Sequence, residues 1–150
     1  QVIGVYDKSL LMPFAEVLKT LGSKHVMVVH ADVGLDEISM TGKTSVAELK
    51  NGKISEWQIN PKDFGMNYDS LDSLAVNSAT ESLSMIKQVF DNKASAALDI
   101  VCLNAGASIY VSGLAPSFAE GVTKAQVAIK TGKAKQKIAS FIAKTQSFTA

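Results

Sequence analysis

Two short apolar runs, Val2-Ile3-Gly4-Val5-Tyr6 and His25-Val26-Met27-Val28-Val29-His30, decide the fold of this 150-residue chain. Both have the length and composition of β-strands. Between them, apolar residues recur at helical spacing, namely Leu10, Leu11, Phe14, Val17, Leu18 and Leu21. Pro13 suits the first turn of such a helix, and Gly22 suits its C-terminal cap. The order strand, helix, strand predicts a βαβ unit, in which the two strands are parallel and the helix covers one face.

A β-hairpin is predicted next, because Asn51-Gly52 is the dipeptide most typical of a tight hairpin turn. Residues 44–50 and 53–59 flank it and predict an antiparallel pair. A parallel unit followed by a hairpin gives an α/β fold with a mixed sheet and helices packed around it. Residues 60–76 show no period and are expected to form a loop.

Helices are expected to fill the rest of the chain, at about residues 79–91, 95–113, 118–131 and 134–145. Ser78 and Ser117 each begin a Ser-x-x-Glu capping box, which marks a helix start. The second helix is mainly apolar and is predicted to lie in the core. Its small residues, around Gly106, let neighbouring backbones approach closely. Asn104 on this helix is expected to be a core amide whose hydrogen bonds are satisfied.

The composition excludes several classes of protein. With 47% hydrophobic and 19% charged residues, the chain can bury the core of one domain and is not intrinsically disordered. The longest mainly apolar stretch, residues 94–114, contains Asp99 and is too polar to span a bilayer, so no membrane contact is expected. Cations are scattered, so no nucleic-acid partner is expected. Cys102 is predicted to be a buried, inert thiol in a reducing, cytoplasmic compartment.

All fifteen cationic residues are lysines, and the sequence contains no arginine. The chain therefore has no side chain that can hold a carboxylate or phosphate through a planar, bidentate pair of hydrogen bonds. An anionic substrate would need lysines, a metal ion, helix N-termini or another chain.

Residues 31–43 follow the second strand without a regular pattern, at the sheet end where open α/β folds bind ligands. Asp36 and Glu37 are adjacent there, and on a loop both can turn toward one point. Mg²⁺ is commonly held by one or two carboxylates, with water and phosphates as further ligands. The spacing alone leaves two interpretations, a Mg²⁺ site or a solvated acidic loop. His25 and His30 bracket the strand, face opposite sides of the sheet and cannot share a metal ion.

A series of short motifs runs along almost the whole chain: Gly4-Val5-Tyr6-Asp7, Ala15-Glu16-Val17-Leu18, Leu21-Gly22, Val28-Val29-His30, Gly34-Leu35-Asp36-Glu37-Ile38-Ser39, Asp63-Phe64-Gly65 and Leu103-Asn104-Ala105. In this order they resemble the anthranilate phosphoribosyltransferase family, whose fold is of the nucleoside phosphorylase and phosphoribosyltransferase kind. The Gly-Leu-Asp-Glu loop and the Leu-Asn-Ala helix are the most specific parts of the resemblance.

The resemblance implies an activity in tryptophan biosynthesis. Such an enzyme transfers phosphoribose from phosphoribosyl pyrophosphate to anthranilate, giving N-(5-phosphoribosyl)anthranilate and pyrophosphate. It implies that Asp36 and Glu37 hold Mg²⁺ associated with the pyrophosphate, and that the intact enzyme is a homodimer. Two alternatives stay open. One is a related pyrimidine nucleoside phosphorylase, and the other is a non-catalytic α/β binding domain whose acidic loop is only solvated.

The chain also departs from this family. Its members are considerably longer and have a small helical domain, a Gly-Thr-Gly-Gly-Asp phosphate loop, a Lys-His-Gly-Asn segment and an arginine that meets the anthranilate carboxylate. None of these occurs in residues 1–150. The resemblance therefore predicts that these residues are the C-terminal portion of one incomplete α/β domain, inactive alone. It assigns no catalytic residue to them, and their substrate-binding residues are unknown.

Overall fold

The central element is a mixed sheet of four strands in the order β1 (Val2–Gly4), β2 (His25–Ala31), β3 (Thr44–Lys50) and β4 (Lys53–Ile59). A computed structural model describes residues 1–148 of the chain. β1 and β2 are parallel, and the other neighbouring pairs are antiparallel. The predicted βαβ unit, the hairpin and the mixed α/β sheet are all confirmed.

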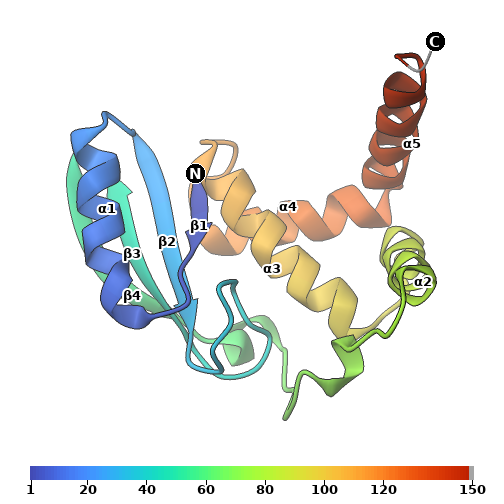
Figure 1. Cartoon of the computed structure of the whole chain (residues 1–150), viewed down its shortest axis with the longest axis horizontal. Coiled ribbons are helices and arrows are strands. Elements are labelled where there is room, and N and C mark those ends of the chain that lie inside the picture. The colour runs from blue at the N-terminus through green and yellow to red at the C-terminus, as the bar shows by residue number, and fades with distance from the viewer. Residues whose placement is uncertain (149–150) are drawn as a thin grey trace.

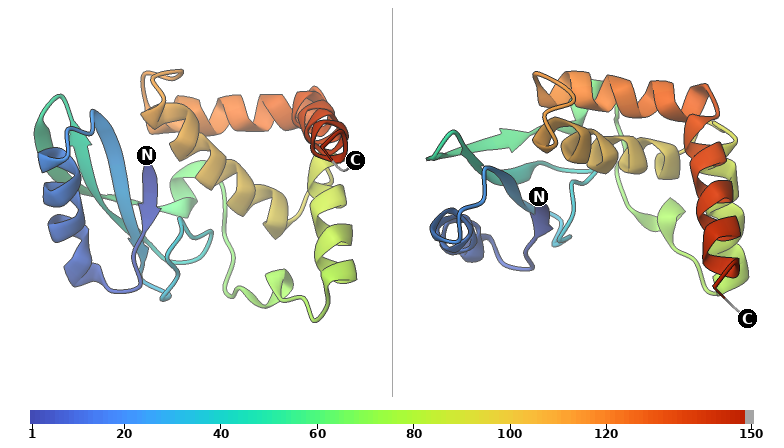
Figure 2. Two further views of the ribbon diagram at one scale, coloured as in Figure 1. Left: turned by 45° about the horizontal axis from the view of Figure 1, so that its top comes forward. Right: turned by 90° about the horizontal axis from the view of Figure 1, so that it is seen from above.

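Helices lie on both faces of the sheet (Figure 1). Helix α1 covers one face, α3 and α4 lie on the other, and α2 and α5 stand away from the strands (Figure 2). The bounds of the helices are α1 Leu11–Thr20, α2 Ala79–Phe90, α3 Ala96–Val111, α4 Phe118–Lys130 and α5 Lys133–Gln146. The last four agree with the expected bounds to within two residues, and α1 lies within residues 10–21, where the apolar spacing predicted a helix. In the described part of the chain no helix is long and apolar enough to cross a membrane.

Strand β2 is apolar on both sides because both sides are covered. Val26 and Val28 belong to the cluster under α1, whereas Met27 and Val29 pack toward α3 and α4. All four are fully buried. This explains why the strand has a continuous apolar run instead of the alternation of a half-exposed strand.

Side-chain caps begin three of the helices. Ser78, Ser95 and Ser117 each accept a hydrogen bond from the backbone N–H three residues later. These bonds satisfy amide groups that have no partner within the helix. The two capping serines predicted from the sequence are confirmed, and Ser95 is a third. After α1, Gly22 adopts φ +86°, a conformation that favours glycine.

A buried carboxylate joins helix α3 to the sheet. Glu48 of β3 is 7% exposed, and its Oε1 accepts a hydrogen bond from the Tyr110 hydroxyl at 2.7 Å. Its Oε2 accepts one from the Trp57 indole N–H at 2.9 Å, and His25 Nε2 lies 2.8 Å from Oε1. Burial raises the pKa of Tyr110, and so does its hydrogen bond to Glu48. Both carboxylate oxygens therefore have hydrogen-bond partners, which offsets the cost of burying this polar group.

Helices α3 and α4 cross at glycines. A Cβ atom on Gly121 would lie 2.3 Å from the Gly106 carbonyl oxygen, and one on Gly106 would lie 2.6 Å from the Val122 nitrogen. The two backbones are therefore in direct contact, as the small residues of α3 predicted. This contact brings α4 against α3 on the sheet face opposite α1.

Two details of the sequence prediction are wrong. The first strand ends at Gly4 and not at Tyr6, because Asp7 accepts hydrogen bonds from Ser9 and starts a 3-10 turn. The segment at 60–76 is not a plain loop, since it contains two short 3-10 helices, Pro61–Phe64 and Asp72–Leu74. Such short helices depend on single caps, and they leave no periodic pattern in the sequence.

We predict that Gly121→Ala destabilises the protein, although alanine is the better helix former by up to about 1 kcal/mol. The new Cβ cannot fit against the Gly106 carbonyl, so the two helices must separate. We expect a net loss of about 2 kcal/mol in the free energy of unfolding, measured by urea denaturation. Thr123→Ala on the exposed side of the same helix is the control and should stay within about 0.5 kcal/mol of wild type. Equal stability of the two variants would contradict the close crossing.

Candidate functional site

The segment that connects β2 to β3 forms the predicted ligand-binding loop, at the C-terminal end of β2. It turns tightly at first, because Gly34 N–H donates to the Ala31 carbonyl and Ala31 N–H donates to the Leu35 carbonyl. Its later residues Ile38 and Met40 are fully buried. Between these two anchored parts, Asp36 and Glu37 are exposed. The acidic pair therefore projects from a loop whose two ends are fixed.

Asn104 of α3 holds this loop by its amide. Its Oδ1 accepts a hydrogen bond from the Ile38 N–H at 3.0 Å, and its Nδ2 donates to the Ile38 carbonyl at 2.8 Å. Nδ2 also donates to the Ile100 carbonyl at 3.0 Å, within its own helix. The prediction that this amide is satisfied is confirmed, although Asn104 is only partly buried and does not lie in the core. Its partner is the backbone of the residue that follows Glu37, so α3 fixes the orientation of the acidic pair.

Gly4 of β1 supports the same loop from the sheet. A Cβ atom at this position would lie 1.5 Å from the Asp36 carbonyl oxygen. Only glycine allows the loop backbone to come this close to the strand. The first strand therefore positions Asp36 through backbone contact, without any side chain.

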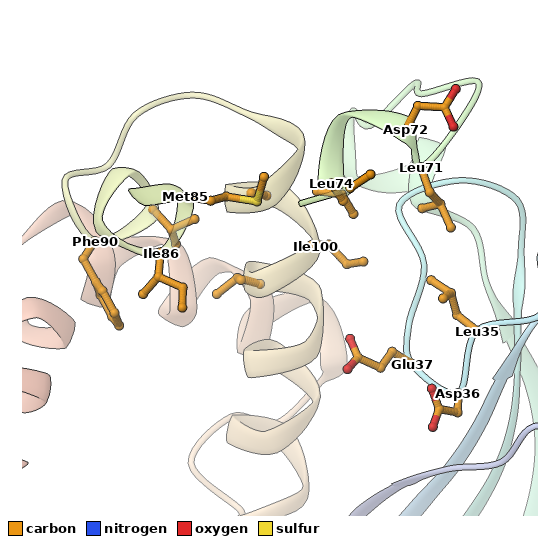
Figure 3. A pocket seen from close by; sticks show the side chains of 14 residues that line it. Leu35, Asp36, Glu37, Leu71, Asp72, Leu74, Met85, Ile86, Phe90 and Ile100 are labelled. Atoms are coloured by element: carbon orange, nitrogen blue, oxygen red, sulfur yellow. The ribbon is translucent and has the colours of Figure 1, made fainter. Parts of the chain in front are cut away.

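Both carboxylates border a cavity of about 790 Å³, which we call the loop cavity (Figure 3). The loop forms one wall, and the 3-10 helix 72–74, α2 and α3 form the others, mainly through apolar side chains that include Leu35, Leu71, Leu74, Met85, Ile86 and Ile100. A second hollow of about 280 Å³ is also bordered by both carboxylates, together with Val2, Gly4, Val29, Asn104 and Ser108. Asp36 and Glu37 therefore share two neighbouring hollows, one apolar and one partly polar.

The carboxylates of Asp36 and Glu37 suit a hard cation that takes only some of its ligands from the protein. Within residues 1–148 no group of three or more His, Cys, Asp or Glu side chains could hold a metal ion. Two exposed carboxylates remain at the loop, which leaves most coordination positions to water and to a ligand. This is the way Mg²⁺ is usually bound beside phosphates.

The histidines and the cysteine lie elsewhere. His25 contacts Glu48 and the Tyr110 ring, whereas His30 Nδ1 lies 2.9 Å from the Val5 carbonyl oxygen. Neither borders the loop cavity. Cys102 is buried, and burial raises the pKa of its thiol to about 11, so it is protonated at neutral pH and inert.

Sequence reasoning found the acidic pair and expected the Asn104 amide to have its hydrogen bonds satisfied, but it did not place Asn104 or Gly4 against the acidic loop. Asn104 and Gly4 stand 66 and 32 positions from Ile38 and Asp36, respectively, and no local pattern links such distant positions. Gly-Leu-Asp-Glu and Leu-Asn-Ala were nevertheless the most specific motifs of the sequence. The structure brings these two motifs together, because the Asn104 side chain is hydrogen-bonded to the backbone of Ile38, the residue after Glu37.

Comparison with known proteins gives consistent matches. The family model described as "Glycosyl transferase family, a/b domain" matches residues 1–135. Anthranilate phosphoribosyltransferase from Hydrogenovibrio crunogenus is 56% identical over 148 residues, which is 99% of this chain and 44% of that protein. The chain therefore spans less than half the length of the relatives it matches.

Two solved structures have the same arrangement of elements. Anthranilate phosphoribosyltransferase from Saccharomyces cerevisiae in complex with PRPP and Mg matches with a TM-score of 0.87 and 25% identity, over 98% of this chain and 43% of that one. The same enzyme in complex with 4-fluoroanthranilate matches with a TM-score of 0.86 and 28% identity, over the same shares.

We predict that Asn104→Leu loosens the acidic loop. Leucine has similar volume but leaves the N–H and carbonyl of Ile38 without partners, at a cost of about 1–3 kcal/mol for each buried group. Amide hydrogen exchange at residues 36–39 should accelerate at least tenfold. Ser108→Ala, one turn along the same helix, is the control and should leave this exchange unchanged. If the loop amides keep their wild-type protection in Asn104→Leu, Asn104 does not hold the loop.

Proposed function

We propose that this chain forms the metal-binding part of an anthranilate phosphoribosyltransferase. The chain belongs to the glycosyl transferase family, whose a/b domain matches residues 1–135. Such an enzyme transfers phosphoribose from phosphoribosyl pyrophosphate to the amine of anthranilate, releasing pyrophosphate. The observation that carries the proposal is the 56% identity to the Hydrogenovibrio crunogenus enzyme, which extends over nearly all of this chain. A pyrimidine nucleoside phosphorylase is less favoured, because the relatives and solved structures reported above bear the transferase name.

We assign Asp36 and Glu37 as the protein ligands of Mg²⁺. Three observations support this: both carboxylates are exposed, both border the same hollows, and the loop backbone is fixed by Asn104 and Gly4. The yeast relative has been solved with PRPP and Mg. When bound, Mg²⁺ stabilises the negative charge that develops on the departing pyrophosphate.

The chain's own residues have positioning roles in this scheme. Asp36 and Glu37 hold the cation, and Asn104 keeps their loop in place through Ile38. With no arginine in the sequence, residues 1–150 offer no bidentate anchor for the anthranilate carboxylate. We therefore place that anchor and the phosphate loop outside residues 1–150, which we take to be the C-terminal portion of the α/β domain. A homodimeric intact enzyme and a cytoplasmic location stay predictions.

The metal role can be tested in a hybrid enzyme, in which residues 1–150 replace the matched part of the Hydrogenovibrio crunogenus protein. The double variant Asp36→Asn with Glu37→Gln should fold normally, since exposed side chains have few contacts to lose. Losing about 3 kcal/mol of leaving-group stabilisation corresponds to a rate roughly a hundredfold lower. The Mg²⁺ concentration for half-maximal activity should rise, because neutral amides replace charged ligands.

Glu56→Gln with Asp69→Asn is the matched control, because it removes two exposed acids outside residues 31–43 and leaves the acidic pair intact. This control should keep both the wild-type rate and the wild-type Mg²⁺ dependence. If the Asp36 and Glu37 variant behaves like the control, the acidic loop is only solvated and the metal assignment fails. A folded wild-type hybrid that forms no phosphoribosylanthranilate would instead contradict the proposed activity itself.

Residues 1–150 alone should not catalyse the transfer, because the phosphate loop and the carboxylate anchor lie outside them. The measurement is the fluorescence of phosphoribosylanthranilate formed from anthranilate, phosphoribosyl pyrophosphate and Mg²⁺. The wild-type hybrid serves as the positive control in the same assay. Product formation by the isolated chain above the uncatalysed rate would refute this prediction.

A further inference from the structure

The side chain of His30 contacts the backbone of β1 at the end of the sheet where the acidic loop begins. Its Nδ1 lies 2.9 Å from the Val5 carbonyl oxygen. A carbonyl oxygen only accepts hydrogen bonds, so Nδ1 carries the proton and donates it. The side chain alternates along β2 with those of Val26 and Val28, which lie under α1. His30 is therefore on the sheet face opposite α3, the helix that lines the loop cavity.

This contact stands in for a missing bond in the parallel ladder between β1 and β2. Along such a ladder the backbone bonds are evenly spaced. Met27 N–H donates to the Gln1 carbonyl. Four residues further along both strands, the equivalent donor is the N–H of Ala31 and the equivalent acceptor is the Val5 carbonyl. Ala31 N–H donates instead to the Leu35 carbonyl, at 3.0 Å. The last ladder bond is therefore absent, and an imidazole supplies its donor.

The N–H group of Ala31 that the ladder does not use shapes the acidic loop. Its bond to Leu35, together with the bond from the Gly34 N–H to the Ala31 carbonyl at 2.8 Å, closes the tight turn directly before Asp36. If Ala31 continued the ladder, the Leu35 carbonyl would lose this donor and the turn would open. The side chain of His30 thus lets the strand end and the loop begin at one residue.

The same imidazole fixes the part of β1 on which the loop lies. Within residues 1–148, β1 is an edge strand of three residues and pairs only with β2. Gly4 is in direct contact with the backbone of Asp36, because a Cβ atom on Gly4 would lie 1.5 Å from the Asp36 carbonyl oxygen. A shift of Val5, the next residue, would move this support. His30 therefore acts on the acidic loop through both Ala31 and Val5.

We propose that His30 is a positioning residue for the Mg²⁺ site. Its imidazole holds the end of β1 and frees Ala31 to form the turn that precedes Asp36 and Glu37. It acts without contacting the cation, as outer-shell partners do when they orient the ligands of a metal ion. This inference rests on the proposed function, because it takes the acidic pair to bind Mg²⁺. Its consequence for the loop backbone does not depend on that assignment.

Three variants of the hybrid enzyme test this role. His30→Leu removes the donor, whereas His30→Asn places an amide Nδ2 where it can donate as Nδ1 does. Val26→Ala, on the same face of β2, is the matched control, because it removes buried apolar atoms and destabilises the fold without removing a donor.

The first readout is the Mg²⁺ concentration for half-maximal activity. It should rise roughly tenfold in His30→Leu, the lower end of the effect of losing an outer-shell partner. It should keep the wild-type value in His30→Asn and in Val26→Ala. The KM for anthranilate should not change in any of the three, because the carboxylate anchor lies outside residues 1–150.

The second readout, amide hydrogen exchange at Gly34, does not require activity. Exchange should be about tenfold faster in His30→Leu than in the wild-type hybrid, because the turn opens locally. It should keep the wild-type rate in His30→Asn and in Val26→Ala. Circular dichroism melting checks that each variant folds. His30→Phe, which keeps a planar ring, replaces His30→Leu if that variant does not fold.

Either readout at its wild-type value in His30→Leu overturns the proposal. An equal change in Val26→Ala also overturns it, because lost stability would then be the cause. So does a failure of His30→Asn to restore both readouts, because the donated hydrogen bond would then not matter. A wild-type hybrid without activity, or one unaffected by the Asp36 and Glu37 double variant, contradicts the proposed function instead. Exchange at Gly34 then still decides whether His30 holds the loop.

Discussion

The pairing of the Asn104 amide with both backbone groups of Ile38 is the contact on which the arrangement of the site depends. It fixes a point of the loop one residue after Glu37 to a helix in the core. The same helix is tied to the sheet one and a half turns further on, where Tyr110 donates to the buried Glu48. Because α3 is held at both points, the sheet sets the orientation of the acidic loop, although the side chains of Asp36 and Glu37 are exposed.

Backbone proximity is the second constraint on the site. Gly4 lets the loop rest on β1, and the Gly106 and Gly121 pair lets α4 rest on α3. In both places a single methyl group would push the backbones apart. Close packing of this kind transmits displacements, because interiors are dense and tolerate little change in volume. The position of the acidic pair therefore depends on small residues that bear no functional group.

Much of the fold could be predicted because its signals are local. The Asn51-Gly52 turn fixed the hairpin, and Ser78 and Ser117 marked helix starts through bonds that span three residues. The candidate acidic pair was also visible, as adjacent carboxylates after an apolar strand. What escaped prediction depends on long-range contacts, such as Asn104 with Ile38 or Glu48 with Tyr110. In a sequence, the buried Glu48 looks like any strand glutamate, because its partners come from β2, β4 and α3.

The acidic pair lies on one wall of the loop cavity, and helix α2 lies on another. A group that fills this cavity therefore lies beside both carboxylates and against apolar side chains such as Ile86. The chain places two carboxylates there and has no arginine, so it offers no bidentate anchor for an anionic group. A ligand in this cavity would gain affinity from the burial of apolar surface, which is non-directional but large, and orientation from the two carboxylates.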